Sequence, residues 1–110
     1  MPYIKAKHRK ELDILIDQLA DRLVREAKEY PDPGAFAGLL HYTCSRLALK
    51  VVRKQFGRMR YWLIAILTGT FKNIADEFYR RVGAPYEDRL KAENGDLDLF
   101  QKYLEEIEKM

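Results

Sequence analysis

The sequence predicts an all-α fold, a small helical bundle of three long helices plus a short C-terminal helix, and three observations support this. Apolar residues recur every three or four positions along most of the chain, which is the period of an amphipathic helix. Proline and glycine are sparse, four and six in 110 residues, and they separate long uninterrupted segments. The length is that of one ordinary domain, so residues 1–110 are predicted to form a single helical domain.

The first predicted helix covers about residues 8–30. Charged side chains occupy one of its faces, and apolar residues that step by three or four occupy the other. This pattern predicts an amphipathic, peripheral helix whose apolar face is made by Leu12, Leu15, Ile16, Leu19, Leu23 and Ala27.

The second predicted helix runs from about Gly34 to Phe56, after the break at Pro31-Asp32-Pro33. Most of its circumference is apolar, which is typical of a helix at the centre of a fold or in a subunit interface. At 100° per residue, four basic side chains share an arc of roughly 100° on this helix. We call this set the basic stripe, and it consists of Arg46, Lys50, Arg53 and Lys54.

The third predicted helix begins at about Arg58, since Gly57 is typical of a helix stop. Its first turns are apolar on every face from Tyr61 to Leu67, so we expect this run to be deeply packed. A glycine inside the helix, Gly69, predicts the close approach of another helix.

The remainder of the chain is divided by a proline and a glycine. Pro85 has no amide hydrogen and disfavours helix at the preceding residue, so we expect a kink or break there. Further helical turns over about 86–93 lead to an Asn94-Gly95 stop. A short amphipathic helix follows over 97–109, within an acidic C-terminal segment, 97–110.

Charge is unevenly distributed along the chain, although the net charge is only +3. From Pro33 to Ala75 there are seven basic residues and no acidic one, whereas from Asp96 onward there are five acids and two lysines. Such asymmetry is typical of a polyanion-binding surface, or of two segments that attract each other within one molecule or between two.

Catalytic, cofactor and metal sites are not predicted. Cys44 and His41 are near neighbours on one helix, but Cys44 lies in the apolar arc, where a free cysteine is usually an inert filler. No Cys/His spacing resembles a zinc site. A cluster of carboxylates permits a Mg²⁺ hypothesis, but arginines or lysines lie within reach of its members: Asp76, Glu77, Glu87, Asp88, Glu93 and Asp96.

One segment, 77–96, carries an unusual concentration of aromatic, basic and acidic residues. It contains the strings Glu77–Arg81, Ala84–Asp88 and Glu93–Asp96, and it is accompanied by Pro2–Lys5 near the start and His41–Leu47 in the middle. In these strings the chain resembles an uncharacterised family of small helical proteins of bacteria, archaea and phages, a domain of unknown function. The resemblance implies a helical fold and no particular activity. The signature residues are Glu77, Tyr79, Arg80, Arg81, Tyr86, Glu87, Asp88, Asn94, Gly95 and Asp96.

A structural role explains these signature residues without a ligand. We expect Arg80 or Arg81 to pair with Glu87 or Asp88 across Pro85 and so to fix the bend. The two signature tyrosines are expected to pack with satisfied hydroxyl groups. The Asn-Gly pair supplies a positive φ, and the aspartate after it is expected to cap the last helix.

The function best supported by the sequence is a non-catalytic accessory or interaction protein that acts as a homo-oligomer. The alternative is a nucleic-acid-binding regulator that contacts phosphates through the basic stripe, and the third hypothesis is a carboxylate-based, Mg²⁺-dependent nucleotide phosphohydrolase.

Three features predict a cytoplasmic location with no membrane partner. The longest apolar run has seven residues, whereas a membrane span needs about 20. No apolar stretch follows the basic N-terminus, as a secretory signal would require. A single cysteine fits a reducing compartment.

Overall fold

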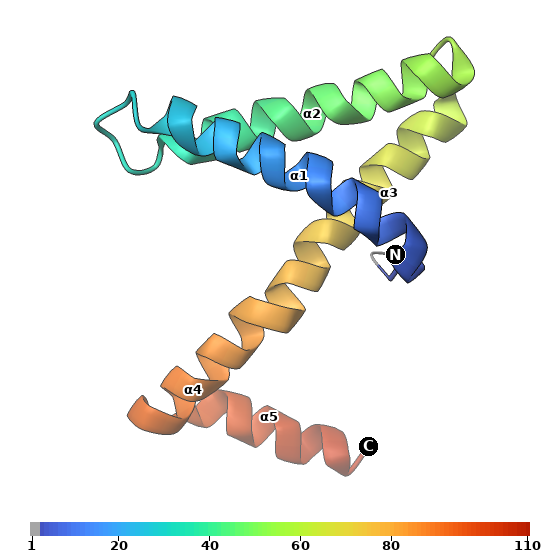
Figure 1. Cartoon of the computed structure of the whole chain (residues 1–110). Helices are drawn as coiled ribbons and strands as arrows, with labels where there is room; N and C mark the ends of the chain where they lie inside the picture. Colours follow the sequence, from blue (N-terminus) through green and yellow to red (C-terminus); the bar gives the residue numbers. More distant parts are fainter. Residues whose placement is uncertain (1–2) are drawn as a thin grey trace. The chain divides into compact units, whose positions relative to one another are not determined.

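The computed structural model describes residues 3–110, and within that range it is built of helices and their connecting turns, with no strand (Figure 1). The prediction of an all-α protein is therefore confirmed. The elements are α1 (Ala6–Ala27), α2 (Ala35–Phe56), α3 (Tyr61–Phe78), the π-helical turn η1 (Tyr79–Gly83), α4 (Ala84–Asn94) and α5 (Asp98–Glu108).

The chain divides into two units, the first ending at Leu67 and the second covering Thr68–Met110. The boundary between the units falls within the residues of α3. The bundle arrangement and the single-domain organisation stay predictions.

In the first unit, α1 and α2 lie side by side and run in opposite directions (Figure 1). The loop between them begins after Ala27 and holds a local turn, in which the Gly34 amide donates to Asp32 Oδ1 at 2.9 Å. The helix-helix contact leaves every residue of α1 at least partly accessible, because α1 contains no buried residue. The peripheral position of this helix in a bundle stays a prediction.

The end of α2 is fixed by a glycine and an arginine. Gly57 has a φ of 80°, in the left-handed region that favours glycine, and its amide donates to the Arg53 carbonyl oxygen at 3.0 Å. The Arg53 guanidinium returns a bond from Nη1 to the Gly57 carbonyl oxygen at 3.0 Å. The predicted stop at Gly57 is therefore found, and one residue of the basic stripe helps to make it.

The described residues contain a very small core, located where α2 meets the first turns of α3. Val52 and Leu63, at 5% and 4% exposure, are the two buried apolar residues among residues 3–110. Beside them, the rings of Phe56 and Trp62 meet edge to face with centroids 5.3 Å apart.

The prediction of deep packing for Tyr61–Leu67 is wrong for most of that run. Leu63 alone in the run is buried, and Tyr61 is 84% exposed. The physical reason is geometric, because a run that is apolar on every face of a helix needs neighbours on several sides. Within the second unit, no helix approaches Gly69 closely, since a Cβ there would meet no atom within 4 Å.

In the second unit the predicted break at Pro85 is replaced by a continuous helix with a wider turn. The Ala84 amide donates to the Tyr79 carbonyl oxygen, five residues back, which is the bonding of a π-helix. Pro85 then occupies the first turn of α4, where a missing amide hydrogen is tolerated. Helix α4 ends at Gly95, whose φ is 88° and whose amide donates to the Lys91 carbonyl oxygen at 2.8 Å.

Within the part of the chain that the structure describes, no helix combines the length and the apolar character that crossing a membrane requires.

Candidate functional site

The signature segment is organised by Tyr79, at the start of the π-helical turn. Its hydroxyl donates to Glu87 Oε2 at 2.7 Å, so one hydrogen bond links the first residue of η1 to the first turn of α4. The two residues are eight positions apart, a rise of about 12 Å along a regular α-helix. The predicted satisfied hydroxyl is thus found for Tyr79, although the residue stays 53% exposed.

Gly83 makes room for the ring of Tyr79. A Cβ built on Gly83 would lie 2.7 Å from Tyr79 Cδ2 and 3.2 Å from Tyr79 Cε2, closer than carbon atoms approach without displacement. The ring therefore lies directly over the glycine backbone, between the tyrosine Cα and its carboxylate partner. Tyr79, Gly83 and Glu87, spaced four and four, form one continuous surface feature.

One ion pair of the two signature arginines is formed before Pro85. Arg80 pairs with Glu77, three residues earlier, and the Arg80 side chain is 70% exposed. An ion pair this accessible contributes at most about 1 kcal/mol. Across Pro85, Glu87 accepts the hydrogen bond of Tyr79, and Asp88 Oδ1 lies 3.6 Å from Lys91 Nζ. One link across the proline is therefore made by a tyrosine.

The remaining carboxylates of the cluster are engaged locally. Glu93 Oε1 accepts from Arg89 Nε at 3.1 Å. Asp96 accepts from the Leu97 amide at 2.8 Å through Oδ1 and from Gln101 Nε2 at 2.6 Å through Oδ2, which ties the start of α5 to the turn before it. Within residues 3–110, no group of three His, Cys, Asp or Glu side chains is placed to hold a metal ion. Tyr86, the other signature tyrosine, is 60% exposed.

The basic stripe lies on an accessible face of α2. A shallow hollow of about 400 Å³ runs along it, lined by Tyr42, Ser45, Arg46, Leu49, Lys50 and Arg53. In the described chain, the side chains of Arg46, Lys50 and Lys54 form no ion pair or hydrogen bond, whereas Arg53 is used to close the helix end. Cys44 is exposed, so the expectation of a buried filler is wrong.

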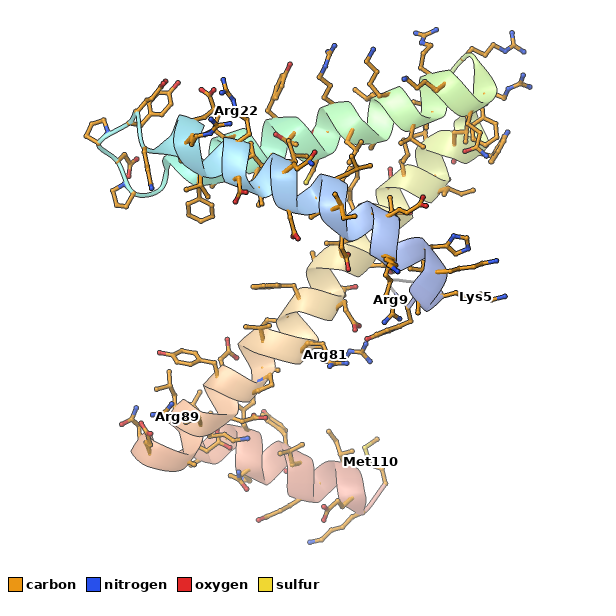
Figure 2. All side chains as sticks on the ribbon, viewed as in Figure 1. Lys5, Arg9, Arg22, Arg81, Arg89 and Met110 are labelled. Atoms are coloured by element: carbon orange, nitrogen blue, oxygen red, sulfur yellow. The ribbon has the colours of Figure 1, made fainter. Side chains whose placement is uncertain are left out.

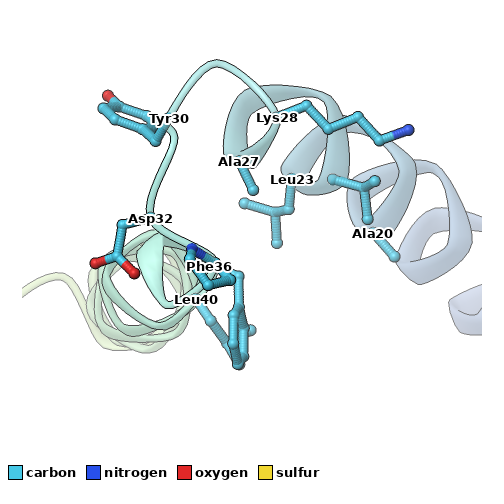
Figure 3. A pocket seen from close by; sticks show the side chains of 10 residues that line it. Ala20, Leu23, Ala27, Lys28, Tyr30, Asp32, Phe36 and Leu40 are labelled. Atoms are coloured by element: carbon cyan, nitrogen blue, oxygen red, sulfur yellow. The ribbon is translucent and has the colours of Figure 1, made fainter.

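A second hollow, of about 460 Å³, lies between α1 and α2 next to their connecting loop (Figure 3). Its floor is apolar, with Leu23 and Ala27 from α1 opposite Phe36 and Leu40 from α2, and Lys28 and Asp32 lie at its rim. We call it the hairpin groove. Sequence reasoning did not identify it, because the groove depends on how two helices pack.

The Tyr79–Gly83–Glu87 feature also escaped prediction from the sequence, although a signal for it was present. An aromatic residue, a glycine and a carboxylate at spacings of four lie near one helix face. The π-helical turn itself had no comparable signal in the sequence. The Glu87 carboxylate accepts a hydrogen bond from the Tyr79 hydroxyl and raises the pKa of Tyr79 above its ordinary value. The phenol is therefore held neutral, which makes it a poor nucleophile.

Replacing Gly83 by alanine tests the packing of the Tyr79 ring. Alanine in place of an open helical glycine stabilises a helix by about 0.5–1 kcal/mol, and Gly69→Ala, where nothing lies within 4 Å, is the matched control. We expect Gly83→Ala to give a smaller gain in thermal stability than Gly69→Ala, or a loss. In a Tyr79→Ala background, Gly83→Ala is expected to stabilise as Gly69→Ala does. Equal gains for the two glycines in the wild-type background would contradict the packing.

Titration of Tyr79 tests its hydrogen bond. The difference in ultraviolet absorbance between the wild type and Tyr79→Phe isolates this residue among the seven tyrosines. Because the raised pKa reflects a neutral phenol favoured by folding, the stabilisation is complete below pH 10 and is lost as pH rises through the folded-state pKa. Glu87→Gln is expected to lower the Tyr79 pKa, and Asp88→Asn to lower it less. An unchanged Tyr79 pKa in Glu87→Gln would refute the assignment.

No curated protein and no solved structure shows a significant match to the chain. A family described as Domain of unknown function (DUF6899) matches residues 1–97, a range that contains every helix up to α4 and stops just before α5. The resemblance noted in the sequence is thus confirmed at the level of the family: the chain belongs to the DUF6899 family.

Proposed function

We propose that this protein is a non-catalytic accessory or interaction protein that acts as a homo-oligomer, with the helical bundle completed between copies. The proposal includes a cytoplasmic location, supported by the single cysteine, whose exposed thiol suits a reducing compartment.

One observation carries the proposal, namely the amount of large apolar surface that the described chain leaves accessible. Val52 and Leu63 are its two buried apolar residues, whereas leucines, isoleucines and aromatic residues of all five α-helices are about half exposed, among them Ile16 (56%), Leu47 (57%) and Phe100 (61%). Full burial of one such side chain is worth about 1.5–3 kcal/mol. Extended apolar surface on a folded chain marks an interaction site.

The distribution of apolar residues favours association of like chains over a single small ligand. A small-molecule site is concave and localised, whereas the exposed apolar residues are spread over every helix. Helices that each keep an uncovered apolar face require other helices, and a second copy supplies them with the same composition.

Light scattering across a dilution series tests the oligomer. We expect an average mass well above 13.0 kDa at high protein concentration, with a fall toward the monomer on dilution and no change in helical content by circular dichroism at the higher concentrations. A single 13.0 kDa species at every concentration would contradict the proposal.

A second candidate function, nucleic-acid binding, is favoured by the state of the basic stripe. Three of its side chains are uncommitted within residues 3–110, and Tyr42, 64% exposed, lies one turn before Arg46. Proteins that bind single-stranded nucleic acid combine basic side chains with an aromatic ring on which a base stacks. It ranks second because Arg53 is engaged with Gly57 and no base-reading motif accompanies the stripe.

Fluorescence anisotropy with a labelled single strand and a labelled duplex tests this second function. We expect weak or no binding at physiological salt, and binding at low salt that weakens steeply as salt is added. Lys50→Glu and Arg46→Glu are better probes than Arg53→Glu, which also removes a helix-end hydrogen bond. Arg25→Glu on α1 is the control. Micromolar binding at physiological salt that Lys50→Glu abolishes and Arg25→Glu spares would place nucleic acid first.

A further inference from the structure

The hollow along the basic stripe is formed by α2. In the described chain all of its lining residues lie on that helix, between Tyr42 and Arg53. Figure 2 shows nitrogen-tipped side chains in a row along one side of α2. The helix contains no aspartate or glutamate, so no carboxylate of α2 itself neutralises these cations. The hollow is therefore a surface of positive charge that suits an anionic ligand.

An aromatic ring and an aliphatic side chain also border this hollow. Tyr42 and Leu49 are 64% and 55% exposed. They are seven residues apart, so they lie within about 20° of each other around the helix and about 10 Å apart along its axis. Ser45 and Arg46 lie between them and complete this part of the lining. One half of the hollow is thus partly apolar, and the other half is basic.

The distance between Tyr42 and Leu49 fits one unpaired base. Stacked bases lie about 3.4 Å apart, so a base with a neighbour on each of its faces needs about 7 Å, which the 10 Å separation provides. Every base has a π-face that stacks on an aromatic ring. A base inside a duplex already has both faces covered and reaches such a ring only if it is flipped out of the stack.

The cations continue the hollow toward the C-terminal end of α2. Arg46, Lys50 and Arg53 fall within an arc of about 60° and are about 6 Å and 4.5 Å apart along the axis. The bond from Arg53 to the Gly57 carbonyl oxygen uses one of the five N–H donors of its guanidinium. A groove of positive charge beside a stacking ring is the arrangement with which proteins follow the backbone of a single strand.

We propose that this hollow is a binding site for single-stranded nucleic acid. An unpaired base stacks on Tyr42, and Arg46, Lys50 and Arg53 contact the phosphates that follow it. The site rests on the second candidate function above, nucleic-acid binding, and it adds the class of nucleic acid and the residue that selects it. Stacking is tolerant of sequence, so the site needs no base-reading motif.

Electrostatic attraction alone gives the opposite preference, which makes the proposal sharp. A duplex carries more negative charge per unit length than a single strand, and each neutralised phosphate contributes a steeper salt dependence on a duplex, about 0.9 against about 0.7. A helix face that binds only phosphates therefore holds a duplex at least as tightly as a single strand. Tighter binding of the single strand requires a contact with the bases.

Fluorescence anisotropy of the full chain at low salt tests this preference. The probes are a labelled DNA single strand of about 10 nucleotides, a duplex of the same length, and an abasic strand with the same number of phosphates. We expect the single strand to bind at least about fivefold more tightly than either of the other two, because only the single strand offers an unpaired base to Tyr42.

Variants of Tyr42 test the stacking contact. We expect Tyr42→Ala to weaken binding of the single strand about five- to a hundredfold, without changing its salt dependence, since no charge is removed. Tyr42→Phe keeps the ring and is expected to bind as the wild type does. Tyr103→Ala, on α5 and similarly exposed at 57%, is the matched control and is expected to have no effect. On the abasic strand, Tyr42→Ala is also expected to have no effect.

The contrary outcomes separate this site from nucleic-acid binding itself. If the duplex binds as tightly as the single strand and Tyr42→Ala matches the wild type, the stripe contacts phosphates alone, and this inference fails while the second candidate function stands. If neither strand binds at low salt, both fail. If a labelled peptide of residues 97–110 binds and neither strand does, the hollow takes an acidic protein segment, which also overturns the proposal.

Discussion

The stability of this chain depends on how much of the apolar surface of its helices is buried. An amphipathic helix in water gains most of its stability from the packing of its apolar face, and an isolated helix of this length is marginal. Helices α1, α4 and α5 contain no buried residue, and the buried core of the described chain is one valine of α2 and one leucine of α3. Large apolar side chains of every helix therefore stay accessible in the described chain.

Local interactions order the chain where packing does not. The π-helical turn lets one helix continue past Pro85, and the Tyr79–Glu87 hydrogen bond crosses that turn on the outside, above Gly83. Left-handed glycines end α2 and α4, and Asp96 connects the last turn to α5. These devices fix where each helix begins and ends without needing a partner. Among the signature residues, Tyr79, Glu87, Gly95 and Asp96 take part in these local interactions.

Most helix boundaries could be predicted, because they depend on neighbours in the sequence. The predicted second helix, 34–56, differs from α2 by one residue at its start, and the Asn-Gly stop coincides with the end of α4. Features that depend on how helices and side chains pack in three dimensions could not be predicted. The apolar run Tyr61–Leu67 indicates that neighbouring side chains are needed but does not identify them. The π-helical turn Tyr79–Gly83 left no recognisable change in the spacing of apolar residues. For the same reason, charge alone did not identify Tyr79 as a hydrogen-bond partner of Glu87.

Chemical unfolding at different protein concentrations tests the central claim most directly, namely that association between copies supplies the missing burial. If folding and association are coupled, the urea midpoint rises with protein concentration, and each tenfold increase adds about 1.4 kcal/mol to the apparent stability of a dimer. We expect this rise over a hundredfold range of about micromolar to sub-millimolar protein. A cooperative transition with the same midpoint at every concentration would contradict it, because the chain would then be stable with its apolar surface uncovered.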